Sequence, residues 1–205
     1  MEPSPRTGVE STPPPPPPPL EPLGARRPHP ARKDWAKTAL EWGGLIVAAL
    51  VIALLIKTFL FQAFYIPSDS MVPTLEKNDR VIVNKLSYRM HGVHRSDIIV
   101  FKAPPGTDKS VKDLVKRVIG LPGDTVEGKN GHVYINGHQL KESYLPAGIT
   151  TSDFAPVKVP PSSYWVMGDN RPYSKDSRYF KFIRKKEIVG RVFLRIWPLN
   201  RLAIL

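Results

Sequence analysis

The sequence predicts a mostly β protein, with an antiparallel, barrel-like β domain behind one N-terminal transmembrane helix and a disordered proline-rich tail. Three observations lead to this prediction. Twelve of the 23 prolines lie between residues 3 and 30. One long apolar stretch follows, at residues 38–61. The remaining residues, 62–205, contain mainly short runs of β-branched and aromatic residues that end in turn-forming residues.

Composition excludes several classes of function. The chain carries 30 Lys and Arg against 18 Asp and Glu, a formal net charge of +12, and it has no cysteine. Disulfide scaffolds, thiol nucleophiles and thiolate metal sites are therefore excluded. Neither a Walker-type glycine loop nor a His-Glu-x-x-His motif occurs, so metal and nucleotide chemistry are disfavoured. The positive charge is compatible with nucleic acid or with an anionic membrane surface.

Residues 1–37 are expected to form the disordered tail. The run Pro13–Pro19 can only be extended polyproline II, because proline has no amide donor and a fixed φ. Such a run could also be a ligand for a proline-recognising module, and the sequence leaves this alternative open. No packed domain is expected in this part of the chain.

Residues 38–61 are expected to form a transmembrane helix. No charged residue occurs from Trp42 to Ile56, and the 19 residues from Thr38 to Ile56 would span roughly 28 Å as a helix, close to the thickness of a bilayer's hydrocarbon core. A buried core helix is the alternative, but the segment shows no polar face at helical spacing. A cleaved secretory signal is also disfavoured, because no small-x-small cleavage site follows.

The charges that flank the apolar segment predict its orientation. Lys57 and Lys77 are the basic residues within about twenty positions after the segment. A denser basic cluster precedes it: Arg26, Arg27, Arg32, Lys33 and Lys37. The positive-inside rule therefore places the tail in the cytoplasm and residues 62–205 outside the membrane.

Residues 62–205 are expected to form one extracytoplasmic β-rich domain. Helical signals are few and short, and the β-branched runs end in turn chemistry, so an antiparallel, barrel-like arrangement is predicted. The expected strands lie at 80–86, 97–102, 132–136, 163–167 and 189–197.

Two serines and one lysine are candidate catalytic residues. Ser68 and Ser70 lie between Pro67 and Pro73, directly after the predicted exit from the membrane. Lys116 lies in an apolar strand, where burial would lower the pKa of its ammonium group. A neutral lysine is a competent general base for a serine nucleophile. The alternatives are an ordinary polar loop for the serines and a surface lysine on an edge strand.

These residues lie in three segments that together resemble a known family. Ser68–Leu75, Lys116–Asp124 and Gly168–Arg178 resemble, in order and spacing, the conserved boxes of bacterial type I signal peptidases, the leader peptidases with a Ser/Lys dyad. The resemblance covers about residues 38–199, and the predicted helix lies where that family has its last membrane anchor. One box alone would be weak evidence, whereas three boxes in order behind an anchor are specific.

The resemblance implies a role for each matching residue. Ser70 would be the nucleophile and Lys116 the general base. Ser68 would add its hydroxyl to the oxyanion hole, and Ser174 would hydrogen-bond and orient the Lys116 amine.

The resemblance also implies how the site is supported and how it binds substrate. Asp176 would pair with Arg117 and Arg178 to brace the site. Shallow pockets for small residues at the first and third positions before the cut would be lined by Phe64, Ile66, Met71, Leu75, Leu114 and Val115.

The activity implied by the resemblance is removal of N-terminal signal peptides from exported preproteins, by cleavage after small-x-small sites. No cofactor and no metal are implied. The expected partners are preproteins, the lipid bilayer and, by proximity, the protein-export machinery, but not nucleic acid. The protein would be a single-pass protein of the cell membrane, with its N-terminus in the cytoplasm.

The chain departs from the family pattern at Ser96, where the family usually has glycine, and in its proline-rich tail. Two other classes stay open. A self-cleaving repressor shares the Ser/Lys dyad, but it would need a DNA-binding module in front. A non-enzymatic membrane-anchored β scaffold explains the anchor, but it leaves the spacing of Ser70, Lys116 and Ser174 to chance.

Overall fold

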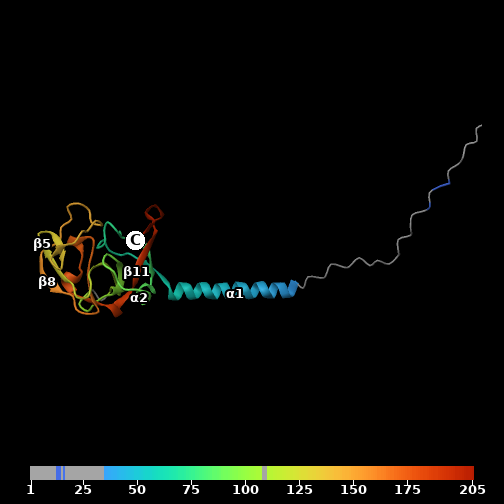
Figure 1. The fold of residues 1–205 in the computed structure, drawn as a ribbon, viewed down its shortest axis with the longest axis horizontal. Coiled ribbons are helices and arrows are strands. Elements are labelled where there is room, and N and C mark those ends of the chain that lie inside the picture. The colour runs from blue at the N-terminus through green and yellow to red at the C-terminus, as the bar shows by residue number, and fades with distance from the viewer. Residues whose placement is uncertain (1–12, 15, 17–34, 108–109) are drawn as a thin grey trace, which may run out of the picture. The chain divides into compact units, whose positions relative to one another are not determined.

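A computed structural model of the protein describes residues 13, 14, 16, 35–107 and 110–205, without the side chains of residues 55–59. Almost all of the expected tail, residues 1–37, lies outside the described residues. The chain divides into two units between Leu45 and Ile46, and helix α1 (Trp35–Phe59) contributes to both (Figure 1).

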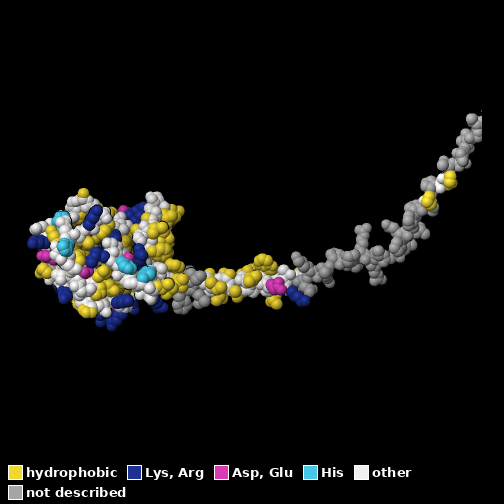
Figure 2. Space-filling view, in the orientation of Figure 1, with side chains coloured by type: hydrophobic (Ala, Val, Ile, Leu, Met, Phe, Trp, Pro, Cys, Tyr) yellow, Lys and Arg dark blue, Asp and Glu magenta, His cyan; other side chains and the backbone are white. Residues whose placement is uncertain are grey.

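Helix α1 carries apolar side chains on all sides. None of its side chains from Trp35 to Leu54 is buried, and this 20-residue stretch is long and apolar enough to cross a membrane. Figure 2 shows hydrophobic side chains along the helix, with charged side chains near its start. Exposure along its length disagrees with a buried core helix and fits a membrane anchor. The helix ends two residues before the expected limit, because Phe61 already belongs to the first strand.

The larger sheet has eight antiparallel strands in the order β1-β2-β11-β3-β4-β9-β10, with β12 paired to β11. Strand β11 lies between β2 and β3 and so brings the end of the chain into the middle of the sheet. The strands are β1 (Phe61–Tyr65), β2 (Arg80–Asn84), β3 (Ile98–Lys102), β4 (Asp113–Gly120), β9 (Ser163–Met167), β10 (Ile183–Arg184), β11 (Ile188–Trp197) and β12 (Ala203–Ile204).

Two of the open strand edges in this sheet lie at β1 and at the first half of β4. Strand β1 is the terminal strand of the sheet and pairs only with β2. Strand β9 pairs with β4 from Arg117 onward, so the first half of β4, residues 113–116, is paired on one side only, with β3. An open edge of this kind offers backbone groups to an added strand.

The smaller sheet has the order β7-β6-β5-β8, built from β5 (Thr125–Lys129), β6 (His132–Ile135), β7 (His138–Gln139) and β8 (Phe154–Lys158). Its two hairpin turns are Asn130-Gly131 and Asn136-Gly137, in which all four residues have positive φ. This is the Asn-Gly chemistry that two-residue hairpins with type I′ turns require. The short helical elements are α2 (Ser87–Met90), η1 (Arg171–Tyr173), α3 (Ser177–Phe180), η2 (Lys185–Glu187) and η3 (Leu199–Arg201).

Buried apolar side chains join the sheets. Trp165 of β9 packs in one cluster with Val126 and Val133 of the smaller sheet, and it stacks on Phe154 of β8 at a centroid distance of 5.3 Å. Burial of each such large side chain contributes roughly 2–3 kcal/mol. The mostly β, antiparallel class with one apolar N-terminal helix is confirmed, and each expected strand is present with ends within about two residues of the prediction.

Candidate active site

Ser70 lies in a tight turn that follows β1. The turn is held by backbone hydrogen bonds from Val72 N to the Asp69 carbonyl and from Leu75 N to the Met71 carbonyl. Met71 and Leu75 are fully buried in the core beneath the larger sheet, so they fix the turn from below. The turn therefore presents Ser70 from a rigid base rather than from a mobile loop.

Lys116 lies within hydrogen-bonding distance of Ser70. Its Nζ is 2.6 Å from Ser70 Oγ and 3.0 Å from the Val115 carbonyl oxygen. Only 3% of Lys116 is exposed. Burial lowers the pKa of Lys116 to about 8, although the carboxylates of Asp176 and Asp169 act in the opposite direction. A lysine in this position can be neutral near physiological pH and can accept a proton from the serine hydroxyl.

Ser68 lies on the same side of the turn as Ser70. Its hydroxyl is 3.4 Å from Ser70 Oγ, at the long end of the hydrogen-bond range. A hydroxyl at this distance from a nucleophile can reach an oxyanion that forms on the attacked carbonyl.

The segment Gly168–Asn170 holds the backbone of Ser70. The Asn170 amide donates to the Ser70 carbonyl at 3.1 Å, and the Asn170 side-chain amide donates to the Asp69 carbonyl at 3.0 Å. Gly168 allows the close approach, since a Cβ there would lie 2.4 Å from the Ser70 carbonyl oxygen and 2.3 Å from Ser174 Oγ.

Ser174 is buried beside these residues, with 4% of its surface exposed. Its hydroxyl has no hydrogen-bond partner among the described residues. The expected hydrogen bond from Ser174 to the Lys116 amine is therefore not present in this structure, although the serine packs against the segment that contacts Ser70.

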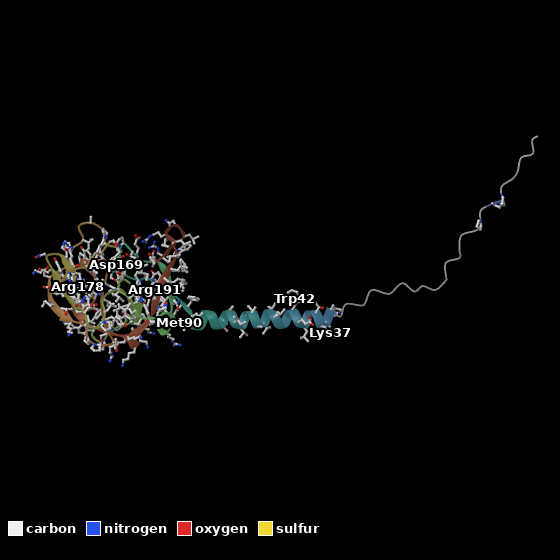
Figure 3. The ribbon with its side chains drawn as sticks, viewed as in Figure 1. Lys37, Trp42, Met90, Asp169, Arg178 and Arg191 are labelled. Atoms are coloured by element: carbon white, nitrogen blue, oxygen red, sulfur yellow. The ribbon has the colours of Figure 1, made fainter. Side chains whose placement is uncertain are left out.

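The ion pairs around the site differ in one respect from the expectation. Asp176 pairs with Arg178 at 2.8 Å and accepts from the Gly168 amide at 3.0 Å, as a bracing residue would. Arg117 pairs instead with Asp169, at 2.8 Å from Nε and 2.6 Å from Nη2. The expected pair of Arg117 with Asp176 is thus replaced by a buried pair with a second carboxylate. Asp169 and Arg178 both lie within the β-rich unit (Figure 3).

A cavity of about 550 Å³ opens over Ser70 and Lys116, between β1 and the first half of β4. Five of the six residues expected to line a substrate pocket do so: Phe64, Ile66, Met71, Leu114 and Val115. Leu75 does not line the cavity; it is fully buried and packs in the same core cluster as Met71. The cavity is also lined by Lys175, Tyr179 and Phe180, which the sequence did not indicate.

Other supporting residues were also missed. Arg171 is buried, pairs with Glu142 and donates to the Gly168 carbonyl at 3.0 Å. Tyr144 stacks on the Arg117 guanidinium at 4.0 Å from its ring centroid and donates to Glu142. Arg171 lies inside the third motif segment, but Glu142 and Tyr144 lie outside all three segments and carry no sequence signal.

The fold and the site together define a β-rich serine hydrolase with a lysine next to its candidate nucleophile. Residues 39–197 match the family described as signal peptidase, peptidase S26. The chain belongs to this family.

Relatives of the chain carry names that agree with this family. A probable signal peptidase I-2 from Synechocystis sp. is 42% identical over 182 residues, which cover 88% of this chain and 81% of that protein. Signal peptidase I S from Bacillus subtilis (strain 168) is 44% identical, covering 81% of this chain and 93% of that protein. A crystal structure of a signal peptidase I from Enterococcus faecalis is 37% identical, covers 48% of this chain and 95% of that chain, and aligns with a TM-score of 0.42.

Proposed function

We propose that the protein is a membrane-anchored signal peptidase I that removes N-terminal signal peptides from exported preproteins, with Ser70 as nucleophile and Lys116 as general base. One observation carries the proposal: a buried lysine with a lowered pKa lies 2.6 Å from a serine hydroxyl at the floor of an apolar cavity. The names of the relatives support the same activity.

The proposed reaction begins with neutral Lys116, which takes the proton of Ser70 as its Oγ attacks the carbonyl carbon before the cut. The Ser68 hydroxyl and the Ser70 backbone amide stabilise the oxyanion, and each such donor is worth about 3 to 4 kcal/mol in comparable sites. The C–N bond then breaks, and the Lys116 ammonium returns its proton to the leaving amine. Lys116 next takes a proton from a water molecule as the water oxygen attacks the acyl carbon; the acyl–Oγ bond then breaks, and Lys116 returns the proton to Ser70 Oγ.

The cavity supports a preference for small side chains before the cut. Its walls carry the apolar side chains of Phe64, Ile66 and Leu114, whose bulk would restrict the positions before the cut to residues such as alanine. The open edges of β1 and of residues 113–116 of β4 border the cavity and can pair with an extended peptide. Such pairing binds the backbone of a substrate and leaves specificity to the pockets.

The proposed location is the cell membrane, with the N-terminus in the cytoplasm and residues 62–205 outside. The basic cluster before Thr38 supports this orientation through the positive-inside rule. Ser70 follows the last residue of α1 by 11 positions, which keeps the site near the membrane surface where signal peptides are held. Enzyme and preprotein then share a two-dimensional phase, which raises their effective concentration. Anionic lipid headgroups and the export machinery are the expected neighbours.

The experiment that tests the function is cleavage of a purified preprotein in detergent by the full chain and by Ser70→Ala. We expect the wild type to release the mature protein and Ser70→Ala to release none. Ser143→Ala is the matched control, because Ser143 is exposed and lies outside the cavity. A chain that cuts only itself would indicate the repressor-like alternative, and no cleavage by folded wild type would indicate a scaffold.

The orientation has its own test. A protease added outside spheroplasts should digest residues after 62 and spare the N-terminal tail. The reverse pattern of digestion would contradict the proposed topology.

A further inference from the structure

Lys175 is the one charged residue of the segment Gly168–Arg178 that lines the cavity. The backbone is extended at Ser174 and at Asp176, and both side chains are buried. Successive side chains of an extended chain point in opposite directions. Lys175 therefore faces away from the buried side, is exposed, and lines the cavity that contains Ser70 and Lys116.

The Lys175 ammonium has no ion pair among the described residues, although carboxylates are close in sequence. Asp176 is committed to Arg178 and Asp169 to Arg117. The cavity wall carries two other Lys or Asp side chains without an ion pair in the described part of the chain, Lys116 and, at the start of β4, Asp113, and no ion pair within 4.0 Å joins Asp113 to Lys175. The cavity that contains Ser70 thus carries, beside Asp113 and Lys116, a lysine with no ion pair to any described residue.

The position of Lys175 places this cation near the bond to be cut. Lys175 and Ser70 line the same cavity, and the backbone of Lys175 follows Ser174, which packs with the Ser70 carbonyl around Gly168. A lysine side chain attached one residue further can reach a peptide that lies over Ser70. An unpaired charge beside a bound peptide favours the opposite charge and disfavours the same charge.

We infer that Lys175 is a specificity-determining residue, which favours substrates with an acidic side chain, and disfavours those with a basic one, within about three residues of the cut. This inference rests on the proposed function. It adds charge selection to the size selection made by the apolar pockets.

The test uses peptide substrates that differ only at one position. Each position from three before to three after the cut, apart from the two that require small residues, carries Glu, Gln or Lys in turn. The measurement is the ratio of kcat/KM for the Glu and Lys peptides on the same enzyme, in which any loss of folded protein cancels. We expect one or two positions at which wild type prefers Glu by about two- to fivefold, the size of an exposed ion pair.

The variants then assign this preference to a residue. Lys175→Gln should bring the ratio close to one, and Lys175→Glu should invert it. Lys181→Glu is the matched control, since it makes the same charge change at an exposed position outside the cavity and should leave the ratio unchanged. Raised salt should reduce the wild-type preference.

The outcomes are distinguishable. The inference is overturned if wild type cuts the Gln peptides but shows no charge preference at any position. It is also overturned if Lys181→Glu alters the preference as much as Lys175→Glu does. Both results leave the proposed function intact. Failure of wild type to cut any peptide, including the Gln series, contradicts the proposed function itself.

Discussion

Arg117 and Asp169 form a buried two-point ion pair that ties together the two halves of the site. Arg117 follows Lys116 on β4, and Asp169 lies between Gly168 and Asn170, which contact the backbone of Ser70. The side chain of Asp169 is 0% exposed and that of Arg117 is 8% exposed. The pair therefore sets how closely the strand that carries the lysine approaches the segment that holds the serine.

Asp169→Asn is expected to destabilise the protein strongly, because it leaves the Arg117 guanidinium buried without a counter-charge. The loss of a partner from a buried ion pair costs about 3–5 kcal/mol. Urea denaturation of the full chain in detergent would measure the loss in the free energy of unfolding. Glu187→Gln is the control, since its partner Arg184 is 60% exposed and such a pair is worth about 0–1 kcal/mol. Similar losses for the two variants would contradict the role of the buried pair.

Gly168→Ala is expected to reduce kcat by on the order of 100-fold, because its methyl group must displace the Ser70 carbonyl, Ser174 or both. A displacement of about 1 Å at Ser70 is enough to misalign it with Lys116. Gly92→Ala is the control, since a Cβ at Gly92 would have no atom within 4 Å. Near-normal cleavage by Gly168→Ala would show that the turn around Ser70 is more adaptable than its packing indicates.

Ser96→Gly is expected to stabilise the protein by about 0.5–1 kcal/mol. Ser96 has a φ of 73°, a conformation that costs a residue with a Cβ about 1–2 kcal/mol and glycine almost nothing. Part of the gain is offset by the greater freedom of glycine in the unfolded chain. The thermal midpoint should rise for Ser96→Gly and fall for Ser143→Gly, which lies at an exposed position with negative φ. A fall for both would mean that the Ser96 side chain makes a compensating contact.

The sequence predicted that Ser70 and Lys116 belong to one site, where the structure brings them within 2.6 Å, but it did not predict all of the contacts around them. Ser70 and Lys116 lie in local motifs whose residue types suit the proposed chemistry. The choice of partner for Arg117 depends instead on which of two nearby carboxylates, Asp169 or Asp176, the fold turns toward β4, and nothing local distinguishes them. Local sequence likewise does not show where Leu75 lies, because an apolar residue next to a site can equally line the cavity or fill the core.

The limits of the helix depend on tertiary structure in the same way. Apolar residues continue from α1 into β1, so hydropathy alone does not show where the helix ends. Phe61 belongs to a strand because it pairs with Asn84 of β2, which lies 23 residues further along the chain. Hydropathy therefore located the apolar segment, and only the strand pairing defines its end.

Lys116 is expected to make the cleavage rate depend on pH. Burial holds its pKa at about 8, so the rate should fall as the pH drops through this value and the ammonium form accumulates. Lys116→Arg should be nearly inactive, since a guanidinium does not deprotonate in this range. A pH–rate profile on a peptide substrate would test both points. Wild-type activity in Lys116→Arg would contradict the role of Lys116 as base.

The same pKa shift should appear as a cost in stability. Above about 10.5 Lys116 is neutral in both the folded and the unfolded chain, so it carries no penalty. Between about 10.5 and 8 the unfolded chain binds the proton and the folded chain does not, so stability falls as the pH falls. Below about 8 both forms are protonated and the penalty levels off at about 3 kcal/mol.

Lys116→Met, of similar volume, should therefore be more stable than wild type at pH 7, by a margin that shrinks toward pH 10.5. The difference in unfolding free energy between the two proteins measures this at each pH and cancels the titration of other groups. A difference that is constant from pH 7 to pH 10.5 would mean that the folded protein does not depress the Lys116 pKa, and the lysine would then be charged when the serine has to lose its proton.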